Sequence, residues 1–527
     1  MRKYITLFCF ILSAFCLSAQ NNLSALIPMP NQYKIGQGKS FAVNNLTKIY
    51  TSNKQLDFTA SLLQQVFKKR MNIQLPVTHS PSADATIRLI IDPTIKGNET
   101  YKLTVTAHGL TIYGSSSIAI QDGIMTTDQL LLGDAFASSR HQIAPITISD
   151  KPRFARRILM LDPARHFLSV KDIKFYIDQM IKYKFNALQL HLTDDQGWRV
   201  EIKGYPKLTA GGPFYTQEEL KDLCNYAALR NVEIIPELDV PGHTVSILSA
   251  YPELACTVND TIPKIIGTTT DMMLCCSQQE VYSFYKVIIS QVCALFPSPY
   301  IHLGGDEAAI SKNWAKCERC QALMKEKGYS NPAQLMIPFF DKILSYVRDA
   351  GKKAILWCEL NNIYAPADDY LFPYPKDVML VSWRNGLTPT CIDITKRYGN
   401  TLILAPGEYA YFDYPQMKGD LPEYNNWGMP ITTLKKSYEF DPGYGLPADR
   451  YNHVDGVMGT LWGEAIIDIN RALYMTYPRA FALSEAGWTD MEHRNWNSFR
   501  QRLYPNLLDL IKCGVSVRAP FEIAKDN

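Results

Sequence analysis

The segment YIHLGGDE, residues 300–307, places two adjacent carboxylates, Asp306 and Glu307, directly after a short apolar run and a pair of glycines. Successive side chains on a strand point to opposite faces, so neighbouring acids share one site only where the strand ends and the chain bends. Two glycines permit that bend and leave room for a ligand close to the backbone. The segment therefore predicts a buried strand that ends in a functional site; the alternative is that the acids cap a following helix.

Similar apolar runs recur from about residue 155 to the end of the chain, and amphipathic helix patterns separate most of them. The strand candidates are RRILMLD (156–162), FNALQLHLT (185–193), VEIIPELDV (232–240), YIHLGG (300–305), KAILWCE (353–359), VMLVSW (378–383), TLILAP (401–406) and DGVMGTLWGE (455–464). Continuous apolar strands that alternate with helices predict a parallel sheet covered on both faces. This number of strands predicts a (β/α)8 TIM barrel. A doubly wound open sheet is the alternative, which the lack of a glycine-rich phosphate loop after the first strand disfavours.

The part of the chain before the barrel has a different pattern. Residues 20–150 mix strand-like runs such as TIRLIID (86–92) with helix-like runs such as QLDFTASLLQQVFKKR (55–70). This pattern predicts a smaller α+β domain without a catalytic constellation. The expected organisation is an α+β domain over residues 20–150, followed by a catalytic (β/α)8 barrel with a helical C-terminal end over residues 151–527.

The first residues are typical of a secretory signal peptide. Arg2 and Lys3 precede an apolar run from Tyr4 to Leu17, and small residues follow at Ser18 and Ala19. Residues 1–19 therefore predict a leader that is removed on export, to the periplasm or the cell exterior. A membrane anchor is the alternative, but the run is short for a spanning helix, and no stable membrane insertion is expected.

Composition describes a globular protein rather than a polyelectrolyte. The chain has 527 residues, of which 46% are hydrophobic and 20% charged, and its formal net charge is +3. This length predicts more than one domain. The small net charge gives no reason to expect a nucleic-acid partner, and oligomeric state is left open.

The twelve cysteines are too sparse for a disulfide scaffold in a chain of this length. Cys317 and Cys320, in the motif CERC, have the spacing of half a zinc site. No second pair with matching histidines follows them. The pattern therefore favours a bridge or two free thiols over a structural zinc site.

Ionisable or indole side chains follow almost every predicted strand. Since catalytic residues of (β/α)8 barrels lie at the carboxyl ends of the strands, these side chains are expected to meet in one pocket. They are Asp162, Arg165, His191, Asp194, Asp195, Glu237, Asp239, His243, Asp306, Glu307, Trp357, Glu359, Trp383, Glu408, Tyr411, Trp462 and Glu464. Many carboxylates together with several tryptophans predict a polar pocket with flat apolar walls, which suits a carbohydrate.

Seven motifs carry a resemblance to a known family. They are LMLDPARHF (159–167), LQLHLTDDQGWRVEI (188–202), IPELDVPGHT (235–244), IHLGGDE (301–307), ILWCE (355–359), YFDY (411–414) and TLWGE (460–464). In order and rough spacing they resemble the β-N-acetylhexosaminidases of glycoside hydrolase family 20. Cys358 and Gly463 depart from the family's usual residues, which affects the expected specificity rather than the expected activity.

The resemblance implies a division of labour between the two adjacent acids. Family 20 enzymes use the substrate's own 2-acetamido group instead of a second flanking carboxylate. Glu307 is then expected to be the general acid and base, holding its proton near the working pH. Asp306 is expected to be charged and to orient the acetamido N–H. No cofactor and no catalytic metal ion are implied.

The resemblance assigns the remaining residues to supporting and substrate-binding roles. His243 and Asp194 resemble groups that tune the acid, although His243 could also be a loop histidine without a role. The substrate-binding set is Arg165, Trp357, Trp383, Tyr411, Asp413, Trp427, Trp462 and Glu464. Cys256 also resembles one half of a loop disulfide, whose other half is either Cys275 or Cys276; reduced thiols are the alternative.

The expected function is that of an exported exo-acting hydrolase for terminal β-linked N-acetylhexosamine in glycans, with retention of configuration. A lacto-N-biosidase-like enzyme that releases a disaccharide is an alternative within the same family. A catalytically inactive sugar-binding protein is a second alternative, and a metal-dependent hydrolase that uses His191 and His243 is a third. GlcNAc versus GalNAc preference and the natural glycan are left open.

Overall fold

A computed structural model describes residues 23–82, 86–134, 141–265, 271–359, 373–418, 429–444 and 453–521. The predicted leader and Trp427 lie outside these described residues. The chain divides into two compact units, one formed by residues 1–153, 181–184 and 480–527 and the other by residues 154–180 and 185–479.

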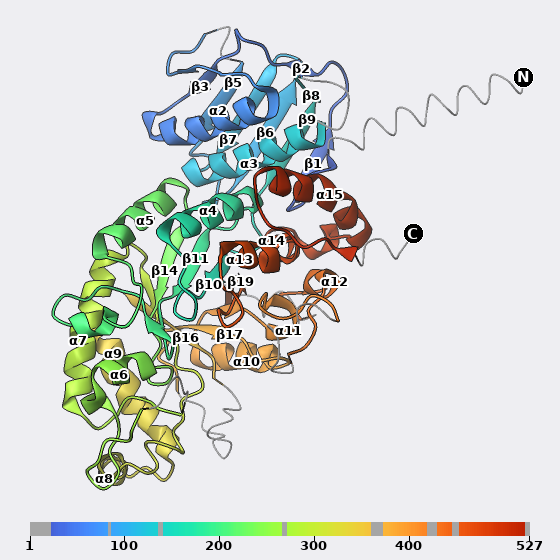
Figure 1. Ribbon diagram of the computed structural model, residues 1–527. Coiled ribbons are helices and arrows are strands. Elements are labelled where there is room, and N and C mark those ends of the chain that lie inside the picture. Colours follow the sequence, from blue (N-terminus) through green and yellow to red (C-terminus); the bar gives the residue numbers. More distant parts are fainter. Residues whose placement is uncertain are drawn as a thin grey trace, which may run out of the picture. The chain divides into compact units, whose positions relative to one another are not determined.

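The first unit contains a mixed sheet of seven strands in the order β1-β9-β6-β7-β5-β3-β4. The strands are β1 (Gln32–Ile35), β3 (Ile49–Thr51), β4 (Val77–Thr78), β5 (Ile87–Ile91), β6 (Tyr101–Thr106), β7 (Gly109–Gly114) and β9 (Ile146–Asp150). Helices α2 (Asp57–Met71) and α3 (Ser117–Asp134) lie on one face of this sheet (Figure 1). Strand β6 buries Tyr101, Leu103 and Val105, whereas the residues between them are exposed or partly exposed, as expected for a sheet covered on one face.

The C-terminal helix α15 (Trp496–Lys512) belongs to this first unit and contacts α3. Arg70 of α2 joins the three helices: its guanidinium binds Asp128 of α3 at 2.6 Å and Asp509 of α15 at 2.5 Å. All three side chains are largely buried, so this ion-pair cluster is screened little by solvent.

The second unit is a closed barrel of eight parallel strands, which confirms the predicted fold class (Figure 1). All of the predicted strand segments are barrel strands. They are β10 (Arg156–Leu161), β11 (Ala187–His191), β14 (Glu233–Glu237), β15 (Tyr300–His302), β16 (Lys353–Trp357), β17 (Met379–Ser382), β18 (Leu402–Leu404) and β19 (Val454–Gly459).

Helices follow the strands around the barrel. They include α4 (Val170–Met180), α5 (Gln217–Leu229), α7 (Gln279–Leu295), α9 (Met336–Asp349), α10 (Thr388–Tyr398) and α13 (Ile469–Thr476). Local sequence signals set their ends. Thr216 and Glu219 form a capping box at the start of α5, and Gly399 ends α10 with φ 78°. These signals fix where α5 begins and where α10 ends.

Branched and sulfur-containing side chains fill the barrel interior, among them Ile158, Met160, Ile235, Ile355 and Met458. The barrel is therefore a packed core, and any ligand site must lie at its ends.

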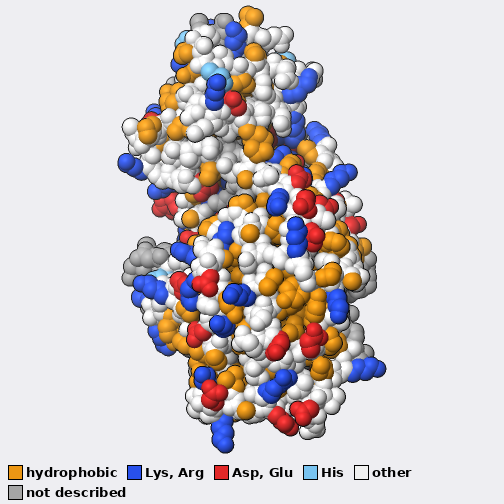
Figure 2. Space-filling model, turned by 90° about the vertical axis from the view of Figure 1, so that its left-hand side faces the viewer, with side chains coloured by type: hydrophobic (Ala, Val, Ile, Leu, Met, Phe, Trp, Pro, Cys, Tyr) orange, Lys and Arg blue, Asp and Glu red, His pale blue; other side chains and the backbone are white. Residues whose placement is uncertain are grey.

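The surface charges are mixed, in line with the small net charge of the chain. On the face drawn in Figure 2, basic and acidic side chains are interspersed. Within the described part of the chain, no helix has the length and apolar character needed to cross a membrane.

Candidate active site

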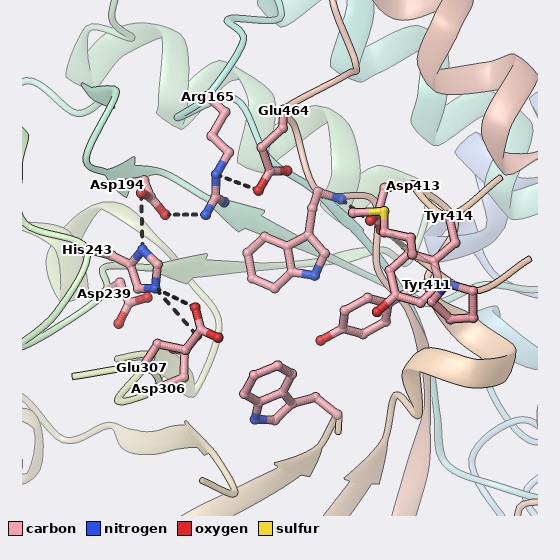
Figure 3. A pocket seen from close by; sticks show the side chains of 14 residues that line it. Arg165, Asp194, Asp239, His243, Asp306, Glu307, Tyr411, Asp413, Tyr414 and Glu464 are labelled. Atoms are coloured by element: carbon pink, nitrogen blue, oxygen red, sulfur yellow. Dashed lines mark hydrogen bonds and ion pairs between the residues drawn. The ribbon is translucent and has the colours of Figure 1, made fainter. Parts of the chain in front are cut away.

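A cavity of about 350 Å³ lies at the carboxyl end of the barrel strands. The side chains that line it are Arg165, Asp194, Asp239, His243, Asp306, Glu307, Trp383, Tyr411, Asp413, Tyr414, Met429, Pro430, Trp462 and Glu464. Ten of these fourteen side chains are labelled in Figure 3. Most residues of the predicted site therefore converge, although they are spread over some 300 positions of the chain.

The loop after β15 bends sharply to bring Asp306 and Glu307 into this cavity. Gly304 and Gly305 have φ of 63° and 96°, and Glu307 itself has φ 47°. A Cβ atom on Gly304 would lie 1.8 Å from Asp239 Oδ1, so only glycine fits there. A left-handed backbone at a non-glycine residue such as Glu307 costs free energy and is concentrated at functional sites. The predicted bend is thus present and aims both acids at one place.

His243 lies between the acid pair and Asp194. Its Nδ1 is 3.3 Å from Asp194 Oδ1, and its Nε2 is 3.6 Å from Glu307 Oε2 and 3.8 Å from Asp306 Oδ2 (Figure 3). His243 also has a left-handed backbone, with φ 51°. This geometry favours the supporting role over the alternative of a loop histidine without function.

Arg165 binds three carboxylates on one wall of the cavity. Its guanidinium contacts Asp162 Oδ2 at 2.7 Å, Asp194 Oδ2 at 3.0 Å and Glu464 Oε1 at 3.2 Å. The guanidinium also lies 5.1 Å from the ring centre of Trp462. These contacts orient Arg165 and Glu464 beside an aromatic face, an arrangement that offers both donors and acceptors to sugar hydroxyls.

Tyr411 lies on the side of the cavity opposite Asp306 and Glu307 (Figure 3). It is buried, and among the described residues its hydroxyl has no acceptor for its O–H, since the Trp462 indole N–H beside it can only donate. Asp306 Oδ1 is also buried without a partner in the described structure. Buried polar atoms are rarely left unsatisfied, so an unpaired donor and an unpaired acceptor across one cavity are available to a ligand that supplies both partners.

The tryptophans of the predicted set are placed differently from one another. Trp383 and Trp462 line the cavity and are partly exposed. Trp357 is 1% exposed and does not line it; its Nε1 donates to Glu237 Oε1 at 2.9 Å, and its ring lies 5.7 Å from that of Trp462. Trp357 therefore supports the cavity from below. Asp413 lines the cavity, and the backbone N–H of Trp462 donates to its Oδ1 at 3.4 Å.

A buried hydrogen-bonded network forms the layer beneath the cavity. Glu237 at the end of β14 contacts His191 at 2.9 Å, His302 at 3.2 Å and Gln189 at 2.8 Å. Burial alone would raise the pKa of Glu237, but His302 and His191 lower it to about 2. The network fixes the strand ends that carry the cavity residues. Sequence patterns indicated His191 and Glu237 here, but not His302, which also contacts Glu237.

The pKa shifts of the two acids run opposite to those that the resemblance predicts. Burial raises the pKa of Asp306, and the neighbouring Glu307 charge adds to this, although His243 opposes it. Burial would also raise the pKa of Glu307, but the hydrogen bond and charge of His243 outweigh it, and the pKa is lowered. Burial disfavours a charge on His243 as well, yet Asp194 raises its pKa well above the ordinary value. The proton expected on Glu307 is therefore held mainly by His243.

Four cavity residues were not in the predicted site. Asp239 follows β14 and was noted only as a residue at a strand end, and Tyr414 lies in the same YFDY motif as Tyr411. Met429 and Pro430 line the cavity from a segment without strand or helix periodicity. Sequence patterns offered a signal for Asp239 and Tyr414, but none for Met429 and Pro430.

The predicted disulfide is absent. The ten cysteines of the described chain are all free, including Cys256, Cys275 and Cys276. Cys256 and Cys275 instead belong to a group that also includes Cys317 and Cys320. The sulfur atom of Cys320 lies 3.8 Å from that of Cys256 and 3.6 Å from that of Cys275, well beyond the length of a disulfide bond of about 2.0 Å.

The barrel and its acidic, tryptophan-lined cavity define a glycoside hydrolase. Residues 154–491 match the family described as glycosyl hydrolase family 20, catalytic domain, and residues 23–151 match glycosyl hydrolase family 20, domain 2. The chain belongs to glycosyl hydrolase family 20, as its motifs predicted.

Individual relatives agree with this membership. The chain is 37% identical over 437 residues to the beta-hexosaminidase of Akkermansia muciniphila, covering 79% of this chain and 85% of the relative. It is 32% identical over 521 residues to the beta-hexosaminidase of Porphyromonas gingivalis, covering 94% of this chain and 64% of that longer protein.

Solved structures of family members are also similar. The exo-β-N-acetylglucosaminidase from Vibrio harveyi in complex with N-acetylglucosamine superimposes with a TM-score of 0.81 at 29% identity, covering 95% of this chain and 79% of that one. A mutant Streptomyces plicatus β-hexosaminidase in complex with its product GlcNAc gives a TM-score of 0.80 at 29% identity, covering 94% and 97%. The family fold therefore extends over both units of the chain.

Proposed function

We propose that this chain is an exo-acting β-N-acetylhexosaminidase that removes terminal, non-reducing β-linked GlcNAc or GalNAc from glycans with retention of configuration. The observation that carries the proposal is a pair of groups on opposite sides of the cavity: Asp306 Oδ1, an acceptor without a donor, and the Tyr411 hydroxyl, a donor without an acceptor. A 2-acetamido group has one N–H donor and one carbonyl acceptor, so it can satisfy both atoms at once.

The proposed reaction uses the acetamido group as the nucleophile. Glu307 gives its proton to the glycosidic oxygen while the acetamido carbonyl oxygen attacks the anomeric carbon, which forms an oxazolinium intermediate and releases the leaving group. Asp306 accepts the N–H hydrogen bond and offsets the positive charge. Water then attacks the anomeric carbon, gives its proton to Glu307 and reopens the ring.

The lowered pKa of Glu307 is compatible with this role once the substrate is considered. The Glu307 side chain is 27% exposed, and a leaving group over it would displace water and raise its pKa. An N–H donated to Asp306 would lower the pKa of that acid. His243, 3.6 Å from Glu307, can return a proton to it. Substrate binding thus moves both pKa values toward the states that the reaction needs.

The test compares turnover of an aryl β-N-acetylglucosaminide with that of the matching aryl β-glucoside, by the unaltered enzyme and by Asp306→Ala and Asp306→Asn. We expect activity on the acetamido sugar only, strong inhibition by a thiazoline that mimics the cyclised intermediate, and a large loss of activity in both variants. Equal turnover of the glucoside would show that Asp306 does not serve an acetamido group.

We also propose that the enzyme acts outside the cytoplasm, in the periplasm or beyond the cell. The basic, apolar and small-residue order of residues 1–19 supports this. The N-terminus of the protein recovered from its native host tests it, because export predicts a chain that begins after Ala19.

A further inference from the structure

Four cysteines from three separate parts of the second unit meet in its interior. The sulfur atoms of Cys256, Cys275, Cys317 and Cys320 all lie within 4.8 Å of one another, and each side chain is at most 2% exposed. Cys320 Sγ is 3.8 Å from Cys256 Sγ and 3.6 Å from Cys275 Sγ, and Cys275 Sγ is 4.0 Å from Cys317 Sγ. The cluster is not part of the cavity described above.

These separations match a metal tetrahedron. Zinc binds thiolate sulfur at about 2.3 Å, which places the four sulfur atoms of a regular tetrahedron about 3.8 Å apart. A disulfide would instead require a pair at about 2.0 Å. We propose that Cys256, Cys275, Cys317 and Cys320 bind a structural zinc ion.

The backbone around the cluster holds the sulfur atoms in place. Cys317 precedes helix α8 (Glu318–Glu326) and Cys320 lies in its first turn, so one helix start supplies two ligands (Figure 1). Cys256 and Cys275 are brought together by an antiparallel bridge between Ala255 and Leu274. The sequence pattern favours an incomplete site at CERC because no second pair with histidines follows it; in the structure the second pair, Cys256 and Cys275, precedes it.

The surroundings suit zinc-bound thiolates. Ser277 Oγ lies 3.2 Å from Cys275 Sγ and 3.6 Å from Cys320 Sγ, so its hydroxyl can donate to a thiolate. Hydrogen bonds of this kind from outside the ligand shell orient metal ligands and strengthen binding. Four soft sulfur ligands with no open position favour a structural zinc ion over a catalytic one.

The position of the cluster gives the ion a structural role, that of linking two loops. Cys256 lies on the loop that follows β14 and carries His243, whereas Cys317 and Cys320 lie beyond Glu307 on the segment that follows β15. Trp314 makes a further link, donating from Nε1 to the Leu274 carbonyl at 2.8 Å. A zinc ion would therefore fasten together the two loops that supply His243 and Glu307. This inference does not depend on the identity of the sugar substrate.

The primary test is elemental analysis of the native full-length protein, purified without chelators, together with a thiol count after denaturation without reductant. We expect a single zinc ion per chain and no loss of thiols. Zinc-free protein that lacks the thiols of two bridges would show that the four cysteines form disulfides. Zinc-free protein with all thiols reduced would show that they are ordinary core residues. Either result would overturn the proposal.

Variants locate the ion. Cys317→Ala and Cys256→Ala are expected to retain less than about a tenth of the zinc and to unfold at lower temperature, because metal binding is coupled to folding. Cys293→Ala removes a buried cysteine of α7 outside the cluster and should keep the full zinc content. Zinc retained in Cys317→Ala would place the ion elsewhere and reject the site. If the variants fail to fold, cobalt added to the zinc-depleted unaltered protein provides a second readout: thiolate-to-cobalt absorption bands are expected, and their absence would reject a four-sulfur site.

Discussion

His243 Nε2 lies 3.6 Å from Glu307 Oε2, while its Nδ1 faces the buried carboxylate of Asp194 at 3.3 Å. The two acids on either side of His243 raise its pKa, and His243 in turn lowers the pKa of Glu307. The pKa of Glu307, the proposed general acid, therefore depends on the charge of His243.

We predict that His243→Gln moves both limbs of the pH–rate profile to higher pH. Loss of the imidazolium removes the group that lowers the pKa of Asp306, so the acidic limb moves to higher pH. Loss of the imidazolium also removes the group that lowers the pKa of Glu307, so the alkaline limb moves to higher pH as well. Turnover at the optimum should fall about 10- to 1000-fold, typical of a perturbed general acid. An unchanged profile in kcat/KM would remove His243 from the proton path.

We predict that Tyr411→Phe separates activity from stability. The O–H of the buried Tyr411 has no acceptor within the described structure, so its removal should change the thermal midpoint little. If the hydroxyl stabilises the acetamido oxygen in the transition state, kcat should fall about 100-fold.

The control for Tyr411 is Tyr285→Phe. Tyr285 in α7 is fully buried, its hydroxyl lacks a partner among the described residues, and it does not line the cavity. This variant should show the same stability response with normal kcat. A Tyr411→Phe enzyme with normal kcat would mean that this hydroxyl is not used in catalysis.

The sequence predicts the barrel and most of the site because the strands, and the residues that follow them, can be recognised from short stretches of sequence. Each strand is a continuous apolar run, and parallel order brings the strand ends together regardless of their separation along the chain. Asp306, Glu307, Arg165 and Glu464 are therefore predictable, since each lies within a few residues of a strand end.

Other features depend on contacts that no local pattern records. Trp357 and Trp462 both lie at strand ends, yet of the two only Trp462 lines the cavity. The Trp357 indole N–H donates instead to Glu237, in the layer beneath the cavity. The grouping of Cys256 and Cys275 with the CERC pair results from the packing of two loops. The direction of the Glu307 pKa shift depends on the orientation of His243, which no local sequence pattern determines.

We predict that Gly304→Ala lowers stability and activity by far more than the left-handed backbone at this position would by itself. A methyl group there would lie 1.8 Å from Asp239 Oδ1, an atom that also accepts the Gly305 N–H at 3.1 Å. Gly351→Ala is the matched control, since Gly351 has a similar φ of 70° and nothing within 4 Å of the added atom.

The control should lose about 1–2 kcal/mol, the cost of a left-handed alanine. Gly304→Ala should lose clearly more stability, and its activity should fall with the displaced Asp306–Glu307 loop. The measurements are the denaturant midpoint and kcat for both variants; equal losses in the two would show that the close approach of Asp239 is unimportant.

The ion-pair cluster of the first unit predicts a pH-dependent stability. Burial would raise the pKa of Asp509, but the hydrogen bonds and charges of Arg70 and Lys69 lower it to about 2. Because the folded-state pKa lies below the unfolded value of about 3.9, the stabilisation is fully present above that pH and is lost as the pH falls toward about 2. Asp509→Asn should therefore cost on the order of 2 kcal/mol at neutral pH and progressively less in acid. Hydrogen exchange of the α15 amides measures this loss of stability locally.

The matched control is Asp377→Asn, whose partner Arg348 lies on the surface, with side chains 46% and 43% exposed. That change should cost less than about 1 kcal/mol, so an equal effect of the two substitutions would contradict a buried cluster that holds α15 in place.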